Sequence, residues 1–340
     1  MAELEKGAVL QIENLSKQYE VKKLFAPNRG MVVRAVDDIS FSVYQGEVFG
    51  IVGESGCGKT TTARMICRAI DPTSGSIIFD AKEHGIVDLA AMSEKELIPV
   101  RRHVQMIFQD PHSSLSPRMS VYNIIAEPLS ATKMTKAETK DRVTELMEMV
   151  GLDPAFMVRY AHAFSGGQRQ RIGIARAMAL APSLVLADEP VSALDVSVQA
   201  QILNLMIDLR EKTKVTYVFI GHDLGVIRYV CDRVAIMYMG KIVELATGSD
   251  IFSAPAHPYT QMLLKSVPDA DPHQPWVDEL EVSELPDATK RIEGCAFAPR
   301  CPRACARCRE ETPALTACGG EGRSRHLAAC FDVNNQATEE

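Results

Sequence analysis

A glycine-rich octapeptide between two apolar segments constrains the fold of this chain more than any other feature. Residues 53–60 read Gly-Glu-Ser-Gly-Cys-Gly-Lys-Thr, after a predicted buried strand at 47–52 and before a predicted helix at 60–70. Glycines let backbone N–H groups close around phosphate oxygens, and the dipole of the following helix adds to the attraction. The segment therefore predicts a phosphate-binding turn between a strand and a helix of an α/β fold.

The side chains of this turn suggest how a nucleotide would be held. A lysine at its end can reach the β- and γ-phosphates, and a following hydroxyl can hold Mg²⁺, so we expect these roles of Lys59 and Thr60. The predicted nucleotide-binding residues of the turn are Gly53, Glu54, Ser55, Gly56, Cys57, Gly58, Lys59, Thr60 and Thr61.

Apolar strands alternate with helices along much of the chain, which predicts a mainly parallel sheet. Further strands are expected at 104–108, 183–187 and 215–220, with a hairpin at 233–245. The stretch from about 112 to 180 departs from this alternation and predicts a helical subdomain, in which Thr135 and Glu138 have the spacing of a capping box.

Prolines gather in residues 253–286, which indicates an arm or linker before a cysteine-rich end. We therefore predict a nucleotide-binding domain over residues 1–252, with its helical subdomain at about 112–180. A C-terminal arm and a small module are predicted over residues 253–340.

Charge and hydropathy exclude several classes of protein. The chain has 37 Lys and Arg against 44 Asp and Glu, and a net charge of −7 argues against a nucleic-acid partner. No stretch approaches the roughly 20 apolar residues that cross a bilayer, so partner chains would supply any membrane-spanning part. The first 18 residues lack a basic start followed by an apolar run, and we expect cytoplasmic residence.

Two carboxylates end the apolar strand at 184–187. Parallel strands end at one edge of a sheet, so Asp188 and Glu189 are expected beside the phosphate-binding turn. Asp188 would hold Mg²⁺ through water, and Glu189 would polarise an attacking water as general base, an effect worth about 10²–10⁴-fold in rate.

A second anion-binding segment opens the helix after residue 165. Ser165, Gly166, Gly167 and Gln168 lie at its start, where free N–H groups attract a phosphate. They resemble the signature motif of ABC ATPases, which meets the γ-phosphate held by the opposing subunit. The resemblance implies a P-loop NTPase of the ABC type with an α/β core of mainly parallel strands, an antiparallel N-terminal β-subdomain, a helical insertion and a Cys-rich C-terminal module.

Other residues match further ABC motifs in order. Gln109 resembles the Q-loop glutamine that senses Mg²⁺ and the transporter contact, and His222 resembles the switch histidine at the γ-phosphate. Asp195 ends a segment similar to the D-loop and is also suited to cap a helix. Tyr19 matches the aromatic position that stacks on adenine, with Phe25 as the alternative. The resemblance thus implies Glu189, His222 and Gln109 as catalytic residues, and Thr60, Gln109 and Asp188 at Mg²⁺.

The resemblance is closest to the ATPases of oligopeptide, dipeptide and nickel importers. It is carried by residues 108–119, 125–129, 190–199 and 257–268. It implies ATP-driven peptide import at the cytoplasmic face of the membrane, with two transmembrane permease subunits and an extracytoplasmic solute-binding protein. The permeases would dock near Gln109 and the helical insertion. Nickel or another small solute is the alternative cargo, and a soluble ATPase of DNA repair or translation is the alternative class.

These importers pair two different ATPases, and the insertion at 21–33 and residues 53–63 are more similar to the second member of the pair. The resemblance implies a heterodimer with a homologous ATPase, each ATP lying between one phosphate-binding turn and the other chain's signature motif. A homodimer is the alternative.

Six of the nine cysteines lie between residues 295 and 330, and a reducing cytoplasm makes a metal more plausible there than disulfides. Cys295, Cys301, Cys308 and Cys330 resemble the C-terminal pattern that binds a 4Fe–4S cluster in this subfamily. Zinc on Cys305, Cys308, Cys318 and Cys330, or unmetallated thiols, are the alternatives. The group would act as a structural staple or as a redox sensor that gates transport.

Overall fold

The computed structural model describes residues 4–20, 32–110, 114–266, 292–318 and 326–333. Its centre is an eight-stranded sheet in the order β11-β12-β10-β9-β3-β8-β7-β6. The strands are β3 (Val48–Val52), β6 (Val104–Ile107), β7 (Leu184–Asp188), β8 (Thr216–Gly221), β9 (Arg233–Tyr238), β10 (Lys241–Thr247), β11 (Thr316–Ala317) and β12 (Leu327–Ala328). The five strands from β9 to β6 are parallel, as the alternation of strands and helices predicts.

The register of the parallel strands brings their carboxyl ends together. Val52 at the end of β3 pairs with Gly221 of β8, and Asp188 of β7 pairs with Ile220 of the same strand. The β3 and β7 strands are buried along their whole length, which explains their unbroken apolar sequences.

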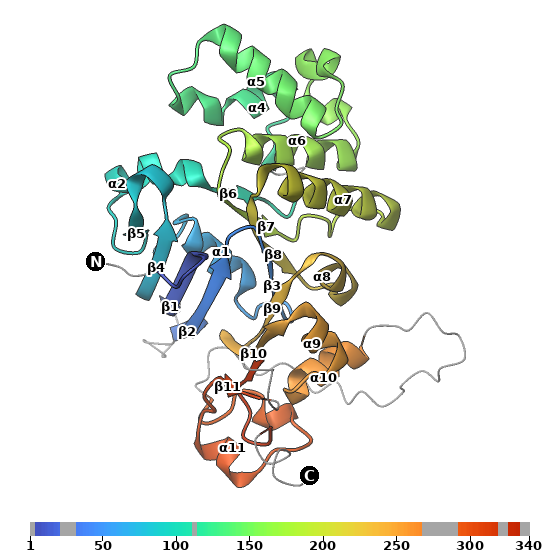
Figure 1. The fold of residues 1–340 in the computed structure, drawn as a ribbon. Coiled ribbons are helices and arrows are strands. Elements are labelled where there is room, and N and C mark those ends of the chain that lie inside the picture. Colours follow the sequence, from blue (N-terminus) through green and yellow to red (C-terminus); the bar gives the residue numbers. More distant parts are fainter. Residues whose placement is uncertain (1–3, 21–31, 111–113, 267–291, 319–325, 334–340) are drawn as a thin grey trace, which may run out of the picture.

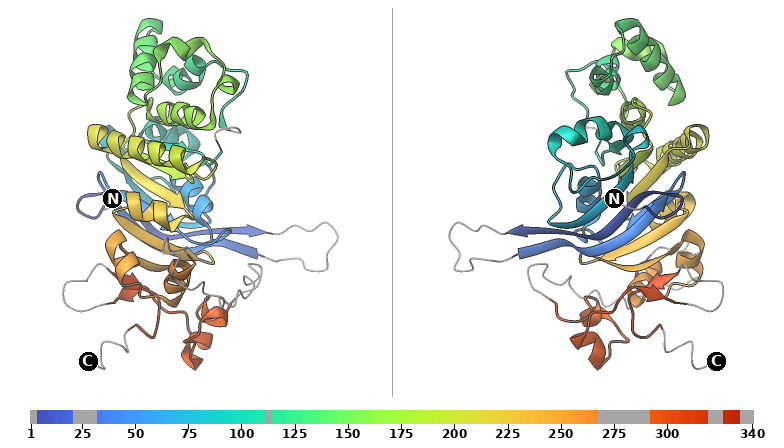
Figure 2. Two further views of the ribbon diagram at one scale, coloured as in Figure 1. Left: turned by 90° about the vertical axis from the view of Figure 1, so that its right-hand side faces the viewer. Right: turned by 60° about the vertical axis from the view of Figure 1, so that its left-hand side comes forward.

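An antiparallel sheet packs beside this core in the order β2-β1-β4-β5 and confirms the expected N-terminal β-subdomain. Figure 2 shows β1 and β2 as a long ribbon that projects from the body. The strands are β1 (Ala8–Glu20), β2 (Val32–Tyr44), β4 (Ser74–Asp80) and β5 (Ile86–Asp88).

Helices cover the sheets and form the predicted helical insertion, which lies at the top of Figure 1. The α-helices are α1 (Lys59–Ile66), α2 (Glu94–Val100), α4 (Val121–Ala126), α5 (Lys136–Met149), α6 (Gly166–Met178), α7 (Val196–Thr213), α8 (Leu224–Val230), α9 (Gly248–Ser253), α10 (Pro258–Lys265) and α11 (Ala306–Glu310). Short 3₁₀ turns are η1 (Lys82–His84), η2 (Arg101–His103), η3 (Pro128–Ala131), η4 (Pro154–Val158), η5 (Ala161–Ala163) and η6 (Ala298–Arg300).

Local sequence patterns predicted most of these helix and strand boundaries. The capping box at Thr135 and Glu138 forms at the start of α5, and Gly151 follows its end with a φ of 70°. The prediction for α1 was too long, because Arg68 adopts a left-handed φ of 54° just after Cys67 and turns the chain away from the helix axis.

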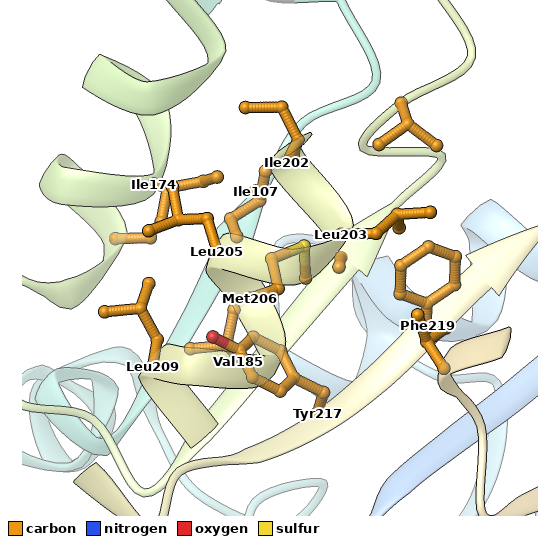
Figure 3. Close-up of a cluster of buried hydrophobic side chains, with 14 of the residues drawn as sticks. Ile107, Ile174, Val185, Ile202, Leu203, Leu205, Met206, Leu209, Tyr217 and Phe219 are labelled. Carbon is orange, nitrogen blue, oxygen red and sulfur yellow. The ribbon is translucent and has the colours of Figure 1, made fainter. Parts of the chain in front are cut away.

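The main hydrophobic core lies between the sheet and helices α6 and α7. Figure 3 shows Met206 and Leu209 of α7 against Tyr217 of β8 and Val185 of β7. A fully buried apolar side chain stabilises the fold by about 1.5–3 kcal/mol, so this layer fixes α7 onto the central sheet.

The C-terminal residues continue the central sheet. Glu244 of β10 pairs with Ala328 of β12, and the buried carboxylate of Glu244 lies 2.7 Å from Nε2 of the buried His326. Phe297 is also buried in the main core. In the described part of the chain, no helix has the length and apolar character needed to span a membrane.

Burial of His257 predicts a pH dependence of stability. Its Nδ1 accepts a hydrogen bond from Tyr259 N at the start of α10, and desolvation lowers its pKa to about 4 from 6.5, against the opposing pull of Glu244. Between pH 6.5 and 4 the unfolded chain binds a proton here that the folded chain does not, so stability rises with pH across this window. Across the whole window, this pKa difference raises the free energy of unfolding by about 3 kcal/mol.

We expect the free energy of unfolding to fall more from pH 7.5 to pH 5 in the unmodified protein than in His257→Asn, which keeps a capping acceptor but does not titrate. Urea unfolding measures this difference. His162→Asn is the matched control on an exposed histidine. Equal pH slopes in the unmodified protein and His257→Asn would contradict the assignment.

Candidate active site

The phosphate-binding turn joins β3 to α1 as predicted, and close packing explains two of its glycines. A Cβ atom at Gly53 would lie 2.1 Å from Met237 O, and one at Gly58 would lie 2.2 Å from Ala35 O. Gly58 also has a φ of 109°, which L-residues rarely adopt. The turn is therefore fixed against β9 and β2.

Lys59 and Thr60 link this turn to its surroundings. Lys59 is buried, and its Nζ donates to Gly53 O at 2.7 Å and to Glu54 O at 3.0 Å. The Thr60 hydroxyl donates to Asp188 Oδ1 at 3.1 Å, so the hydroxyl of α1 and the carboxylate of β7 meet as a pair of oxygen ligands that suits Mg²⁺. Burial raises the pKa of Asp188, and the Thr60 hydrogen bond acts in the opposite direction.

Three predicted catalytic side chains meet at one oxygen atom. Gln109 Nε2 donates to Glu189 Oε2 at 2.9 Å, and His222 Nδ1 lies 3.2 Å from the same oxygen. They follow β6, β7 and β8, whose parallel pairing brings them together. Glu189 also has a left-handed φ of 45°, and its N–H donates to Ile220 O. A carboxylate held in this way is suited to orient and deprotonate a water molecule.

The second anion-binding segment forms the capped start of α6. The Ser165 hydroxyl accepts from Gln168 N, and the Gln168 side chain accepts from Ser165 N. A Cβ atom at Gly167 would lie 2.5 Å from Val198 Cγ1, so packing against α7 excludes a side chain there. Among the described residues, no hydrogen bond or ion pair joins residues 165–168 to residues 53–60.

Two further predicted positions stand apart from this cluster. Tyr19 lies on β1 with 42% of its surface exposed and Lys17 Nζ 5.1 Å from its ring centre, and stacking on adenine stays a prediction. Phe25 lies outside the described residues. Asp195 occupies the N-cap position of α7, but its side chain accepts no capping bond, so the side-chain capping role was wrong. The backbone oxygen of Asp195 accepts from Val198 N and Gln199 N, as the carbonyl of an N-cap residue does.

The C-terminal cysteines converge on one cavity. Cys295, Cys301, Cys308 and Cys330 line it, together with Cys305. Cys305 Sγ lies 3.4 Å from Cys308 Sγ, whereas Cys318 does not line the cavity and donates to His326 O. The rival set that includes Cys318 is thus not brought together. Burial raises the pKa of the Cys295 and Cys301 thiols.

Two residues that sequence reasoning did not assign to the nucleotide site touch the phosphate-binding turn. Arg300 forms a two-pronged ion pair with Glu54, at 3.0 and 3.2 Å. Tyr259 Oη accepts a hydrogen bond from Glu54 N at 3.0 Å. The motif at 257–260 carries the family resemblance but indicates no contact with the turn, and no local pattern links Arg300 to a residue 246 positions away.

Comparison with known proteins shows the family to which the chain belongs. Residues 36–192 match the family described as ABC transporter, and residues 243–308 match the family described as oligopeptide/dipeptide transporter, C-terminal region. The chain is similar to the dimeric ATP-binding cassette MJ0796 in a post-hydrolysis state bound to ADP and Pi, with 27% identity and a TM-score of 0.61. That similarity covers 70% of this chain and 98% of that one.

Curated relatives match over more of the chain. A probable peptide ABC transporter ATP-binding protein, y4tS of Sinorhizobium fredii, is 47% identical over 91% of this chain and 86% of its own. AppF of Bacillus subtilis, an oligopeptide transport ATP-binding protein, is 45% identical over 95% of this chain and 96% of its own. OppF of the same organism is 51% identical over 76% of this chain and 84% of its own. The resemblance and the fold class are confirmed: the chain is an ATPase that belongs to the ABC transporter ATP-binding proteins with the oligopeptide/dipeptide transporter C-terminal region.

Proposed function

We propose that this chain is the ATP-hydrolysing motor of an ABC importer for peptides. The observation that supports the ATPase chemistry best is the meeting of Gln109 and His222 at one oxygen of Glu189. The peptide cargo rests on the relatives, which are named as peptide and oligopeptide transport proteins.

Each residue of the site then has a role. Lys59 and the N–H groups of residues 53–61 bind the phosphates, and Thr60, Asp188 and Gln109 surround Mg²⁺. Glu189 orients and deprotonates water, His222 contacts the γ-phosphate, and Tyr19 stacks on adenine. With these roles, the hydrogen-bond donors that stabilise negative charge and the general base lie at the same edge of the sheet.

We infer that the working unit is a dimer in which Ser165–Gln168 of one chain meets the nucleotide of the other. The capped start of α6 offers N–H groups to a phosphate, and the similar cassette MJ0796 is dimeric. A homologous second ATPase is the proposed partner, with D-loop residue Asp195 at the interface. A homodimer is the opposing outcome, and mass spectrometry of the purified transporter distinguishes the two.

The proposed permease contact is a groove beside Gln109, between the core and the helical subdomain. It is lined by Phe108, Glu127 and Arg176 among others. Phe108 is 45% exposed and the guanidinium carbon of Arg176 lies 5.9 Å from its ring centre, so a partner in this groove would meet an apolar ring beside a positive charge. One of the two membrane subunits docked here would hold the chain as a peripheral protein at the cytoplasmic face of the membrane, beneath an extracytoplasmic solute-binding protein.

The cargo is tested on the assembled transporter. We expect tagged protein to co-purify with two membrane subunits, and we expect the binding protein loaded with a peptide mixture to stimulate ATP hydrolysis in proteoliposomes. Nickel alone is the matched comparison. Stimulation by nickel and not by peptides would contradict the peptide assignment, and co-purification with ribosomes or DNA would contradict the transport function.

We propose that Cys295, Cys301, Cys308 and Cys330 hold a 4Fe–4S cluster. Their cavity has a volume of about 100 Å³, well above the roughly 10–15 Å³ that holds one water molecule, which is space for more than one ion. Zinc–sulfur bonds of about 2.3 Å need sulfurs within about 4 Å of one another. In the described part of the chain, Glu83, His84 and His103 have ligand atoms that all lie within 4.8 Å of one another. No three cysteines of the described chain meet this spacing, which a zinc site would need. When bound, a cluster of this kind would hold together a module with little core of its own.

Iron content tests this centre. We expect Cys301→Ser, purified without oxygen, to lose iron and acid-labile sulfide, because one of four thiolate ligands is gone. Cys318→Ser is the matched control, since Cys318 does not line the cavity. Full iron content in Cys301→Ser, or zinc in place of iron in the unmodified protein, would count against the cluster.

A further inference from the structure

The C-terminal module contacts the phosphate-binding turn directly. Arg300 Nη1 lies 3.0 Å from Glu54 Oε2 and Nη2 lies 3.2 Å from Oε1, and the two side chains are 8% and 24% exposed. A two-pronged pair of this kind fixes the direction of the carboxylate as well as its distance. Because water has little access to the pair, it is screened much less than a surface ion pair.

Aromatic side chains hold the arginine in this position. The guanidinium carbon of Arg300 lies 5.8 Å from the ring centre of Tyr238 and 5.9 Å from that of Phe297. Tyr259 packs against both rings, and its hydroxyl oxygen accepts the hydrogen bond from Glu54 N. Glu54 is thus held at its carboxylate by the module and at its backbone by α10.

Glu54 in turn positions the phosphate-binding lysine. Lys59 Nζ donates to the backbone oxygens of Glu54 and of its neighbour Gly53. A shift of the Glu54 peptide therefore displaces a hydrogen-bond partner of Lys59. The route from Arg300 to Lys59 passes through one intervening residue.

The other end of this route is the cysteine cavity. Arg300 ends the η6 turn and precedes Cys301. Ala298 N donates to Cys295 O, Cys301 N donates to Ala298 O, and Cys295 N donates to Cys308 O. The backbone bonds of the turn that carries Arg300 therefore involve Cys295 and Cys301, which line the cavity, and Figure 1 shows the module and α10 beneath β10.

We propose that the C-terminal module sets the nucleotide affinity of this ATPase, with Arg300 as the positioning residue that holds Glu54 and, through it, Lys59. The dependence of nucleotide affinity on Arg300 rests only on the contacts described above. A second dependence, on whether the cysteine cavity holds its metal, rests on the proposed metal centre. Coupling between two sites is reciprocal, so nucleotide would stabilise the loaded module by the same factor.

Arg300→Met tests the positioning role, because it keeps an unbranched apolar side chain and removes the charge. We expect the Kd for MgADP, measured by calorimetry on the purified chain, to rise roughly tenfold, within the range of coupling found for residues in contact. Arg307→Met is the matched control from the same module, since Arg307 pairs with Glu311 at the end of α11 rather than with the turn, and does not line the cysteine cavity. An unchanged Kd in Arg300→Met, or an equal change in both variants, would overturn the proposal.

A double-mutant cycle separates positioning from a general loss of structure. If Arg300 acts through Glu54, the combination of Arg300→Met with Glu54→Gln weakens MgADP binding no more than the larger single effect. Additive effects would overturn this route. Tyr259→Phe, which keeps the ring and removes the hydroxyl oxygen that accepts from Glu54 N, is the second variant if Arg300→Met does not fold.

Removal of the metal tests whether nucleotide affinity depends on the metal in the cysteine cavity. We expect chelator-treated, metal-depleted protein to bind MgADP more weakly than metal-loaded protein, and we expect this difference to vanish in Arg300→Met. Equal affinity of the loaded and depleted unmodified protein would overturn the metal dependence and leave the Arg300 result standing. Absence of metal from the purified chain would instead refute the proposed metal centre.

Discussion

Glu189→Gln is expected to lower ATP turnover by roughly 10²–10⁴-fold, the usual contribution of a general base, while ATP binding is retained. The amide keeps the shape of the side chain and still accepts a hydrogen bond from Gln109, but it cannot take a proton from water. Lys59 and the Thr60–Asp188 pair are untouched by the change. Steady-state hydrolysis by the assembled transporter and binding of a labelled ATP analogue measure the two quantities.

Glu211→Gln makes the same chemical change at an exposed position of α7 and serves as the control. It should hydrolyse ATP at the rate of the unmodified protein. Rapid hydrolysis by Glu189→Gln would remove Glu189 as the base. Loss of ATP binding in that variant would show that the carboxylate supports the fold of the site instead.

Lys59→Ala is expected to weaken binding of ATP by about 10- to 150-fold. The estimate converts the about 1.5–3 kcal/mol of a hydrogen bond to a charged group into a ratio of dissociation constants. Lys59 is buried beside the carbonyl oxygens of Gly53 and Glu54, and α1 begins at this residue, where alanine is well tolerated. Calorimetry with a non-hydrolysable ATP analogue measures the change.

Lys140→Ala, at an exposed position of α5, is the control for the loss of a lysine charge. Its affinity for the analogue should match that of the unmodified protein. An unaltered affinity in Lys59→Ala would contradict the phosphate role. A large drop in melting temperature would show that the lysine mainly supports the turn.

Local signals in the sequence determined much of this protein. The glycines at 53–60 predict a tight turn because few other residues adopt a φ such as the 109° of Gly58. Apolar strands such as Leu184–Asp188 predict a buried parallel sheet because both of their faces are covered. The order of the motifs along the chain was enough to indicate an ABC ATPase, which the matching families confirm.

Other features depended on tertiary structure, because they arise from contacts between distant segments. The meeting of Gln109 with Glu189 follows from the order of β6 and β7 in the sheet, across 80 residues of sequence.

The phosphate-binding turn shows the division most clearly. Its sequence determined the conformation of the turn, because backbone geometry depends on the glycines of the turn itself. Only the tertiary structure decided what holds Glu54 within it, since Arg300 is 246 residues away and reaches the turn through the packing of Phe297 against Tyr238 and Tyr259. Side-chain complementarity between distant segments leaves no periodicity or spacing in the sequence.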